Sequence, residues 1–278
     1  MEQEQLEKFK IWFYDYVAGF YGDDEYANAN LKLKEEHTRR TCGEMLYLAE
    51  ELGLDANQKR IAEVIALFHD IGRFEQFVRY RTYNDVKSLN HCLLGLEVLQ
   101  KTKVLEVIER KERELVEKAI EYHGRKELPG NLDGRYLLFS KMIRDADKVD
   151  VLYVVTEFYR KRRDEPESVI LELEFSDEPR CSPEVVEDIL QARRIDYSSL
   201  RTLNDMRLLQ LGWVYDVNFV VTLKRIRERR FLELLFDFLP KTGDIEKVKE
   251  KIFRFVDSRI ESANKQQVKT NGFPLSQE

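Results

Sequence analysis

Residues 66–74, Ala66-Leu67-Phe68-His69-Asp70-Ile71-Gly72-Arg73-Phe74, lead from an apolar helical pattern directly into a histidine–aspartate pair. Upstream of the pair, apolar side chains recur at the spacing of one helical face, namely Ile61, Val64, Ile65 and Phe68. Asp55 followed three residues later by Gln58 is typical of a capping-box helix start. We therefore predict a helix that ends at His69-Asp70, where Gly72 permits the chain to unwind.

Helical periodicity continues on both sides of this pair. Gly (12) and Pro (6) are few, while Glu, Lys, Arg and Leu are frequent, which favours long helices. The predicted helices cover about 6–20, 29–51, 55–70, 89–102, 112–123, 135–160, 183–195, 202–228, 231–239 and 243–262. The expected fold class is all-α, a helical bundle with additional C-terminal helices.

The chain divides into three predicted segments. Residues 1–162 form a helical domain that contains every histidine, and residues 163–263 form a helical extension that packs on the same core. The stretch 161–183 is charged and contains proline, so we expect a crossing loop in which 169–175 can be extended. Residues 264–278 are expected to form a disordered tail.

Composition and charge exclude several classes of protein. The net charge of −6 provides no overall basic field for a nucleic-acid polymer. No run of about 18 apolar residues predicts a membrane span, and the acidic N-terminus lacks the apolar segment of a signal peptide. The three cysteines form no CxxC pair, which favours reduced thiols. We expect a cytoplasmic protein, and a homodimer is compatible with the sequence.

All four histidines fall between residues 37 and 123, each within or beside an apolar helical segment. Imidazole together with carboxylate is a ligand set for divalent metals such as Mn, Fe, Co, Ni and Zn. Helical bundles build such sites from side chains on facing helices. The sequence therefore predicts a buried site for one or two divalent transition-metal ions. Its six candidate ligands are His37, His69, Asp70, His91, His123 and Asp147.

Six ligands exceed the number that one tetrahedral ion needs, and they suit two metals about 3.5–4 Å apart. Asp70 has two carboxylate oxygens and can bridge such a pair. Alternatively, His69 and Asp70 converge on one ion if the helix unwinds. Two divalent ions carry +4 and the carboxylates of Asp70 and Asp147 carry −2, so the site is left near +2. This local excess favours an anionic substrate in spite of the negative net charge.

The order His … His-Asp … His … His … Asp resembles the HD-domain superfamily of metal-dependent phosphohydrolases, over about residues 33–155. Residues 66–74 look like the helix-terminal HD signature of that superfamily. The segments His91-Cys92-Leu93-Leu94-Gly95 and Ala119-Ile120-Glu121-Tyr122-His123 resemble its auxiliary-histidine segments. Arg144-Asp145-Ala146-Asp147-Lys148-Val149-Asp150 resembles its closing helix. Four separated elements in register make the resemblance specific, and it implies an HD-domain-like helical bundle.

The resemblance also implies a division of the ligands. One metal would be held by His37, His69, Asp70 and Asp147. His91 and His123 would bind a second metal. Alternatively, they are not ligands and contact the substrate phosphate or support the ligands from outside. Asp145 and Asp150 fit supporting or surface positions better than ligand positions.

The activity implied by the resemblance is hydrolysis of a phosphate ester, with a small phosphorylated molecule such as a nucleotide as substrate. Asp70 would be a metal ligand that also orients the attacking water. Lys148, beside Asp147, would neutralise charge on the substrate, although an ion pair with Asp145 is the competing interpretation. The segment after the histidine–aspartate pair is interpreted as a loop whose arginines bind phosphate or stay solvated, namely Arg73, Arg79 and Arg81.

Two other functions stay open at this level. Some HD-fold proteins resemble this ligand pattern and use a di-iron pair to activate O₂. The spacing of 22 residues between His69 and His91 is compatible with that branch of the superfamily. The second alternative is a non-catalytic, effector-binding HD module, although such domains usually lack ligands. Cys92 lies on a predicted ligand-bearing helix, but nothing near it in the sequence indicates an activated thiolate.

Overall fold

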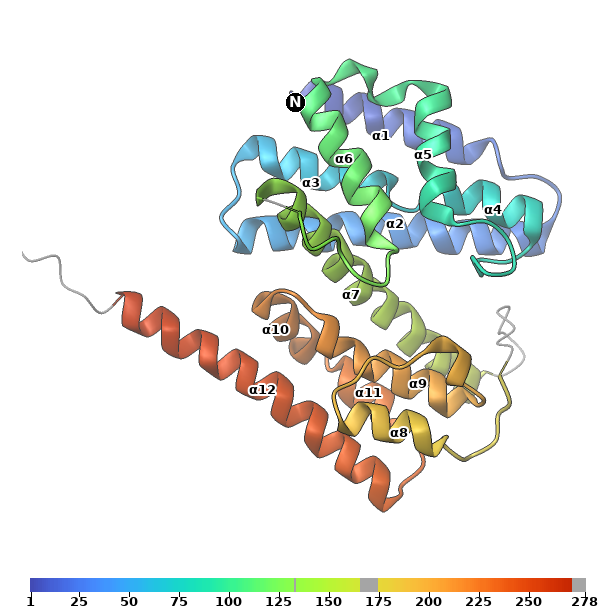
Figure 1. Ribbon diagram of the computed structural model, residues 1–278. Helices are drawn as coiled ribbons and strands as arrows, with labels where there is room; N and C mark the ends of the chain where they lie inside the picture. Colours follow the sequence, from blue (N-terminus) through green and yellow to red (C-terminus); the bar gives the residue numbers. More distant parts are fainter. Residues whose placement is uncertain (133, 166–174, 272–278) are drawn as a thin grey trace, which may run out of the picture. The chain divides into compact units, whose positions relative to one another are not determined.

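The computed structural model describes residues 1–132, 134–165 and 175–271, and these ranges are helical as predicted (Figure 1). Within them no strand forms, and the single extended pairing is an isolated bridge between Ser176 and Thr202. The all-α prediction is therefore confirmed. None of the described helices is long and apolar enough to cross a membrane.

The chain forms two compact units, an N-terminal unit of residues 1–154 and a C-terminal unit of residues 155–278. The N-terminal unit contains α1 (Gln3–Ala18), α2 (Glu25–Glu51), α3 (Ala56–Phe68), α4 (Gly72–Tyr80), α5 (His91–Thr102), η1 (Val104–Val107), α6 (Arg110–His123) and the start of α7 (Gly134–Asp164). The C-terminal unit contains the end of α7, α8 (Pro183–Leu190), η3 (Tyr197–Ser199), α9 (Leu203–Gly212), η4 (Trp213–Asp216), α10 (Val220–Glu228), α11 (Phe231–Asp237) and α12 (Gly243–Asn271). The boundary predicted at residue 162 lies further along α7.

Local sequence signals fix where the helices of the N-terminal unit begin. Asp55 and Gln58 form the predicted capping box at the start of α3, since each side chain bonds the backbone of the other residue. Asn90 caps α5 by accepting from the backbone N–H of Leu93 at 3.1 Å. The two caps fix where α3 begins and where α5 begins with His91.

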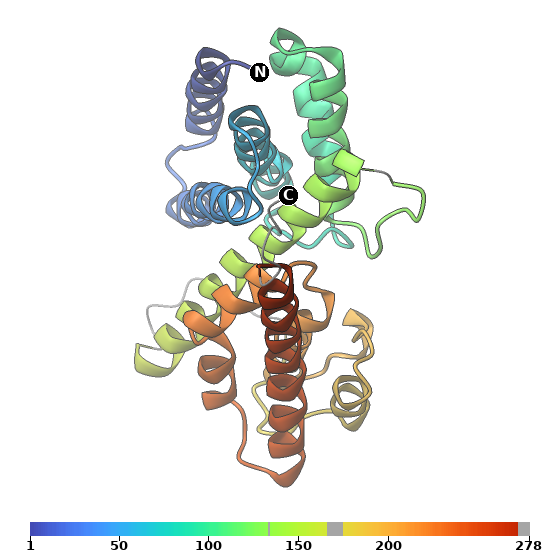
Figure 2. The same cartoon turned by 90° about the vertical axis from the view of Figure 1, so that its left-hand side faces the viewer.

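α3 is the central helix of the N-terminal unit, because it contacts α1, α2 and α6 (Figures 1 and 2). Its apolar residues are almost completely buried, including Ile61, Ile65 and Phe68. The Phe68 ring packs edge-on against Phe9 of α1, with ring centroids 5.7 Å apart. Burial on this scale holds the end of α3, where His69 follows, in a fixed position.

A glycine contact brings α4 and α5 together at backbone distance. A Cβ atom on Gly72 would collide with the carbonyl oxygen of His91 and would lie 2.6 Å from the backbone nitrogen of Gly95. Only a residue without a side chain fits there. The role predicted for Gly72 was to let the helix unwind, but its decisive property is this close approach, which brings His91 towards Asp70.

The sequence interpretation of residues 73–81 as a loop was wrong. Residues 72–80 form α4, because Phe74 and Phe77 are one turn apart and both are buried. The helix ends at Arg81, whose backbone adopts the left-handed conformation (φ 56°). Arg73 and Arg79 therefore project from a helix.

The C-terminal helices also differ in extent from the prediction. The predicted helix over 202–228 is divided into α9, η4 and α10, because the backbone is extended at Val217 and Phe219. α8 ends at Leu190, before the predicted residue 195. α12 continues to Asn271, so residues 264–271 of the predicted disordered tail are helical, in a stretch without Gly or Pro. The extended segment predicted at 169–174 and the disordered tail predicted at 272–278 lie outside the described residues.

Gly72→Ala should destabilise the N-terminal unit, because the added methyl group collides with backbone atoms that cannot move independently. We expect a loss of about 1–3 kcal/mol or more in the free energy of unfolding, measured by urea denaturation. Gly43→Ala is the matched control, since Gly43 is exposed within α2 and a Cβ atom added there would meet nothing within 4 Å. This control should gain about 0.5–1 kcal/mol. Equal effects of the two substitutions would contradict the close contact.

Candidate metal centre

Four helices of the N-terminal unit bring the four histidines together. His37 lies in the middle of α2, His69 follows the last residue of α3, His91 opens α5 and His123 closes α6. All four are buried, and none is more than 8% exposed. Buried polar rings need hydrogen-bond partners or a cation, so the contacts of each nitrogen decide what this cluster can bind.

The Nδ1 atom of each ring is held by an acceptor outside the cluster. The acceptors are Asp150 Oδ2 for His37 (2.7 Å), Asp85 Oδ2 for His91 (2.6 Å), and the carbonyl oxygens of Ala66 for His69 and of Ile120 for His123 (2.7 Å each). A carboxylate or carbonyl oxygen requires a proton on the nitrogen that faces it. The neutral rings therefore keep a lone pair on Nε2.

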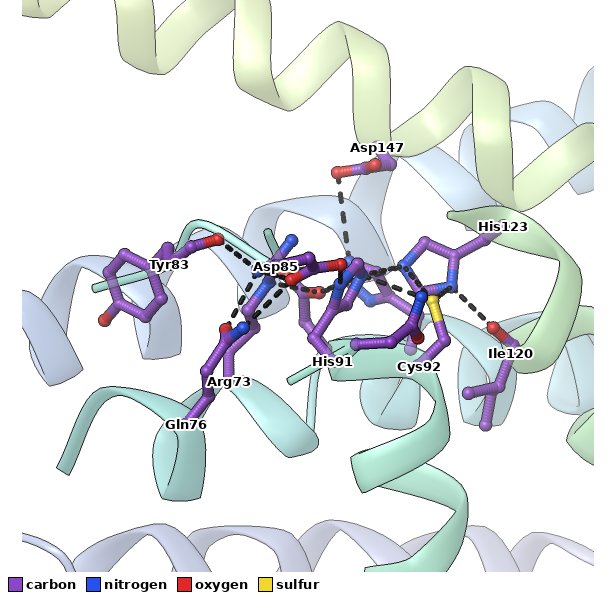
Figure 3. A network of polar contacts seen from close by, with 12 residues as sticks. Arg73, Gln76, Tyr83, Asp85, His91, Cys92, Ile120, His123 and Asp147 are labelled. Carbon is purple, nitrogen blue, oxygen red and sulfur yellow. Dashed lines mark hydrogen bonds and ion pairs between the residues drawn. The ribbon is translucent and has the colours of Figure 1, made fainter. Parts of the chain in front are cut away.

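The Nε2 atoms face one another in two pairs. His37 Nε2 lies 3.3 Å from His69 Nε2. His91 Nε2 lies 3.1 Å from His123 Nε2 (Figure 3). Two facing lone pairs repel, so each pair requires either an extra proton, which makes one ring a buried cation, or a metal ion between the nitrogens. Burial lowers the pKa of His69 to about 4. In His37 the hydrogen bonds to Asp147 and Asp150 outweigh burial and raise the pKa, so an extra proton of the first pair belongs on His37.

The carboxylate of Asp70 lies between the two histidine pairs. Its Oδ2 atom is 3.5 Å from His37 Nε2 and 3.7 Å from His69 Nε2. Its Oδ1 atom is 3.5 Å from His91 Nε2 and 3.8 Å from His123 Nε2. The two oxygens of this carboxylate therefore face different histidine pairs. Asp70 is placed to be a ligand that both pairs could share.

Asp70 is ionised although it is buried. Burial favours the neutral acid, but the positive charges of Lys34 and Arg73 hold the pKa of Asp70 well below its usual value. Lys34 Nζ lies 2.8 Å from Oδ2, and Arg73 Nε lies 3.4 Å from Oδ1. The centre thus contains a negative charge that two basic side chains compensate from outside.

Asp147 of α7 approaches the first histidine pair from the opposite side. Its Oδ1 atom is 3.3 Å from His37 Nε2 and 3.9 Å from His69 Nε2. Nitrogen and oxygen ligands bound at about 2.0–2.2 Å to one tetrahedral ion are separated by roughly 3.3–3.5 Å. Burial would raise the pKa of Asp147, but His37 holds it below its usual range, so both carboxylates are ionised. The spacing and the two negative charges are therefore compatible with a divalent metal ion. The six side chains predicted from the sequence as ligands are all brought together here.

Comparison with protein families agrees with this geometry. The family model of the HD domain matches residues 12–152, just over half of the chain. The chain belongs to the HD domain family. Comparisons with curated proteins and with solved structures gave no match. The matched region contains both histidine pairs and both carboxylates, and the resemblance inferred from the sequence is confirmed.

Cys92 is a residue of this HD domain whose surroundings sequence reasoning did not reveal. Its Sγ atom lies 3.3 Å from His91 Nε2 and 3.6 Å from His123 Nδ1 (Figure 3). Burial would raise the pKa of the Cys92 thiol, but His123 and His91 lower it to about 6. The expectation that nothing activates this thiol is therefore wrong, because the second imidazole arrives from a different helix.

Two acids behind the HD centre orient its histidines, and each is itself held by an arginine. Arg40 Nε and Nη2 lie 2.6 and 3.1 Å from the two oxygens of Asp150. Arg73 Nη1 donates to Asp85 Oδ1 at 2.8 Å, and the buried amide of Gln76 donates to the same oxygen at 2.9 Å. Such partners fix the ring orientation and raise the basicity of the inward nitrogen.

The four basic residues predicted to act on the substrate have different contacts in the structure. Arg73 is committed to Asp70, Asp85 and neighbouring backbone. Arg79 and Arg81 are half-exposed and form ion pairs with Glu75 and Asp24, and within the described part of the chain neither contacts the histidine cluster. Lys148 donates to the carbonyl of Arg144 at 3.5 Å.

Sequence reasoning missed two contributors to the centre, Lys34 and Asp85, for different reasons. Lys34 lies one turn before His37, so helical spacing could have identified it. Asp150 was interpreted only as a supporting or surface acid, and its contact with His37 is a supporting one. Asp85 lies in the irregular segment between α4 and α5, where no periodicity predicts which way a side chain points.

Asp150→Asn should weaken metal binding, because the amide is a poorer acceptor for the His37 Nδ1 proton and removes the closer of the two charged partners of Arg40. We expect a roughly 10- to 100-fold loss of affinity for zinc or manganese in the metal-free protein, measured by isothermal titration calorimetry. Glu36→Gln is the matched control, since Glu36 is half-exposed beside His37 and pairs with the same Arg40. Unchanged affinity in the Asp150 variant would show that this acid does not support the metal site.

Proposed function

We propose that this protein is a metal-dependent phosphohydrolase of the HD domain family that acts on a small phosphorylated molecule such as a nucleotide. The observation that supports the proposal is the Asp70 carboxylate, whose two oxygens each face one pair of imidazole Nε2 atoms. The three cysteines are free thiols, which supports the cytoplasm as its compartment.

The proposed metal ligands fall into two groups that share Asp70. His37, His69 and Asp147 belong to the first group, and His91 and His123 to the second. Bound divalent ions would supply Lewis acidity, which polarises a phosphoryl oxygen and lowers the pKa of water. The identity of the metal within the series Mn, Fe, Co, Ni and Zn is left to experiment.

The local charge of the loaded centre explains why an anion would bind to an acidic protein. Two divalent ions outweigh the carboxylates of Asp70 and Asp147, so a positive excess faces the substrate. Lys34 adds a cation at the edge of the centre, where its Nζ atom touches Asp70 and lies 5.3 Å from the ring centre of Tyr83. This arrangement supports phosphate as the group that enters.

The chain's own residues would then perform three tasks. Asp70, as a shared ligand, orients the attacking water. Lys148, adjacent to Asp147 on α7, neutralises charge that develops on the phosphate. Arg79 and Arg81 have exposed ion pairs that a phosphate can replace at small cost, whereas Arg73 contributes by holding Asp70 and Asp85 in place.

Asp70→Ala should abolish phosphate release and remove bound metal, because both ligand groups lose their shared carboxylate. Helix content, measured by circular dichroism, should be largely preserved. The readouts are elemental analysis and phosphate release with a panel of nucleotides and phosphoesters supplied with Mn, Co, Ni or Fe. Asp15→Ala, on the exposed face of α1, is the matched control. Unchanged activity of the Asp70 variant would remove this residue from the mechanism.

The same panel separates hydrolysis from its two alternatives. An HD-fold di-iron oxygenase would contain iron, consume O₂ in a substrate-dependent way and release no phosphate from any compound. A non-catalytic, effector-binding module would bind a phosphorylated compound without turnover. Either result would overturn the proposed reaction while leaving the metal centre in place.

Lys148→Gln should reduce kcat/KM by about 10- to 100-fold, which corresponds to the loss of one hydrogen bond to a charged group. Metal content should not change, because Lys148 is not a proposed ligand. Lys118→Gln provides the control, since Lys118 is exposed on α6 and pairs with Glu121. If kcat/KM of the two variants is the same, Lys148 has no role in the reaction and acts only in the structure of α7.

A further inference from the structure

Cys92 shares a small buried space with the second histidine pair. Its Sγ atom lies 3.3 Å from His91 Nε2 and 4.0 Å from His123 Nε2, and these two nitrogens are 3.1 Å apart. The three atoms form a triangle with sides typical of ligands that share one ion. The Cys92 side chain is only 2% exposed.

The backbone around Cys92 is shaped to admit its sulfur atom. A Cβ atom on Gly124 would lie 2.6 Å from Cys92 Sγ and 3.2 Å from His91 Cε1. Gly124 directly follows His123 at the end of α6, so the absence of a side chain there lets the sulfur reach both imidazoles. Any larger residue would push Cys92 or His91 out of the triangle.

An ordinary buried thiol does not satisfy this cluster. The single S–H proton of Cys92 can be donated to His91 Nε2, but His123 Nε2 then still faces that nitrogen without a proton of its own. His123 Nδ1 is already engaged with the carbonyl of Ile120. One thiol proton between two neutral rings therefore leaves one buried acceptor unpaired. Either a further proton on the histidine pair or a shared metal ion satisfies all three atoms, and the triangle of their distances fits the metal ion.

We propose that Cys92 is a thiolate ligand of the metal ion held by His91 and His123. This inference rests on the proposed metal centre but not on the proposed reaction or substrate. It makes the two ligand groups chemically different, because the group of His37 and His69 offers only nitrogen and oxygen. The thiol proton passes to solvent when the metal binds.

A thiolate determines which metal the second position accepts. Soft sulfur ligands favour zinc, and cobalt, nickel or iron follow, whereas manganese and magnesium prefer oxygen. The thiolate adds a third negative charge to those of Asp70 and Asp147, which still leaves two divalent ions in excess by one positive charge. We therefore expect the second position to hold zinc or cobalt when the first holds manganese.

Cobalt(II) added to the metal-free protein under argon tests the proposal, because a cobalt–thiolate bond gives a charge-transfer absorption band in the near ultraviolet. The decisive protein is the double variant Cys42→Ser/Cys181→Ser, in which Cys92 is the only remaining thiol. We expect this variant and the unmodified chain to bind two cobalt ions and show the band. Cys92→Ser should lose the band and retain one tightly bound ion.

Each outcome distinguishes this inference from the proposed function. Cobalt bound without the band in the double variant, or a band that persists in Cys92→Ser, would overturn the role of Cys92 and leave the metal centre intact. If no cobalt binds to the unmodified chain, the metal centre itself is refuted. Should Cys92→Ser fail to fold, the double variant alone decides, because its cobalt–thiolate band can come from no other thiol. The second readout is the ratio of the affinities for zinc and manganese. We expect this ratio to be at least tenfold greater in the double variant than in Cys92→Ser.

Discussion

One carboxylate between two pairs of imidazoles is the constraint on which the rest of this structure depends. Asp70 faces His37 and His69 with one oxygen and His91 and His123 with the other. Those rings come from α2, α3, α5 and α6, so the packing of four helices must be correct to within ångströms at one point. The backbone contact between Gly72 and Gly95 provides part of that precision, because it fixes how closely α5 approaches the break after α3.

The orientation of the rings is determined outside the centre. Each Nδ1 atom is occupied by an acceptor, which leaves the Nε2 lone pairs directed inward. Arg40 and Arg73 in turn hold the acids Asp150 and Asp85. Buried lone pairs and carboxylates that face one another destabilise the folded protein unless a cation lies between them. The fold therefore forms a site that favours a positive charge before any ligand binds.

The two halves of the centre differ in chemistry, and this difference links structure to the proposed function. Asp147 faces the first pair with oxygen, whereas Cys92 faces the second with sulfur. In the proposed centre, two unlike positions would hold one ion firmly and leave another more exchangeable, while the shared Asp70 would keep both next to the phosphate of the proposed substrate. Lys34 shares α2 with His37, and Lys148 shares α7 with Asp147, so the side chains proposed for substrate and for metal lie on the same helices.

The sequence by itself determined the helical fold, the break after Phe68 and the six side chains that gather, because helical spacing and capping are local properties of the chain. It did not show that residues 72–80 are helical or that residues 202–228 are interrupted, since burial of Phe74 and Phe77 and the turns at Val217 and Phe219 depend on neighbours distant in sequence. Only the tertiary structure decided which histidines pair, which oxygen of Asp70 faces each pair, and that Asp85 and Cys92 take part. The physical reason is that a metal centre is defined by distances of a few ångströms between atoms on different helices, and these distances are set by packing.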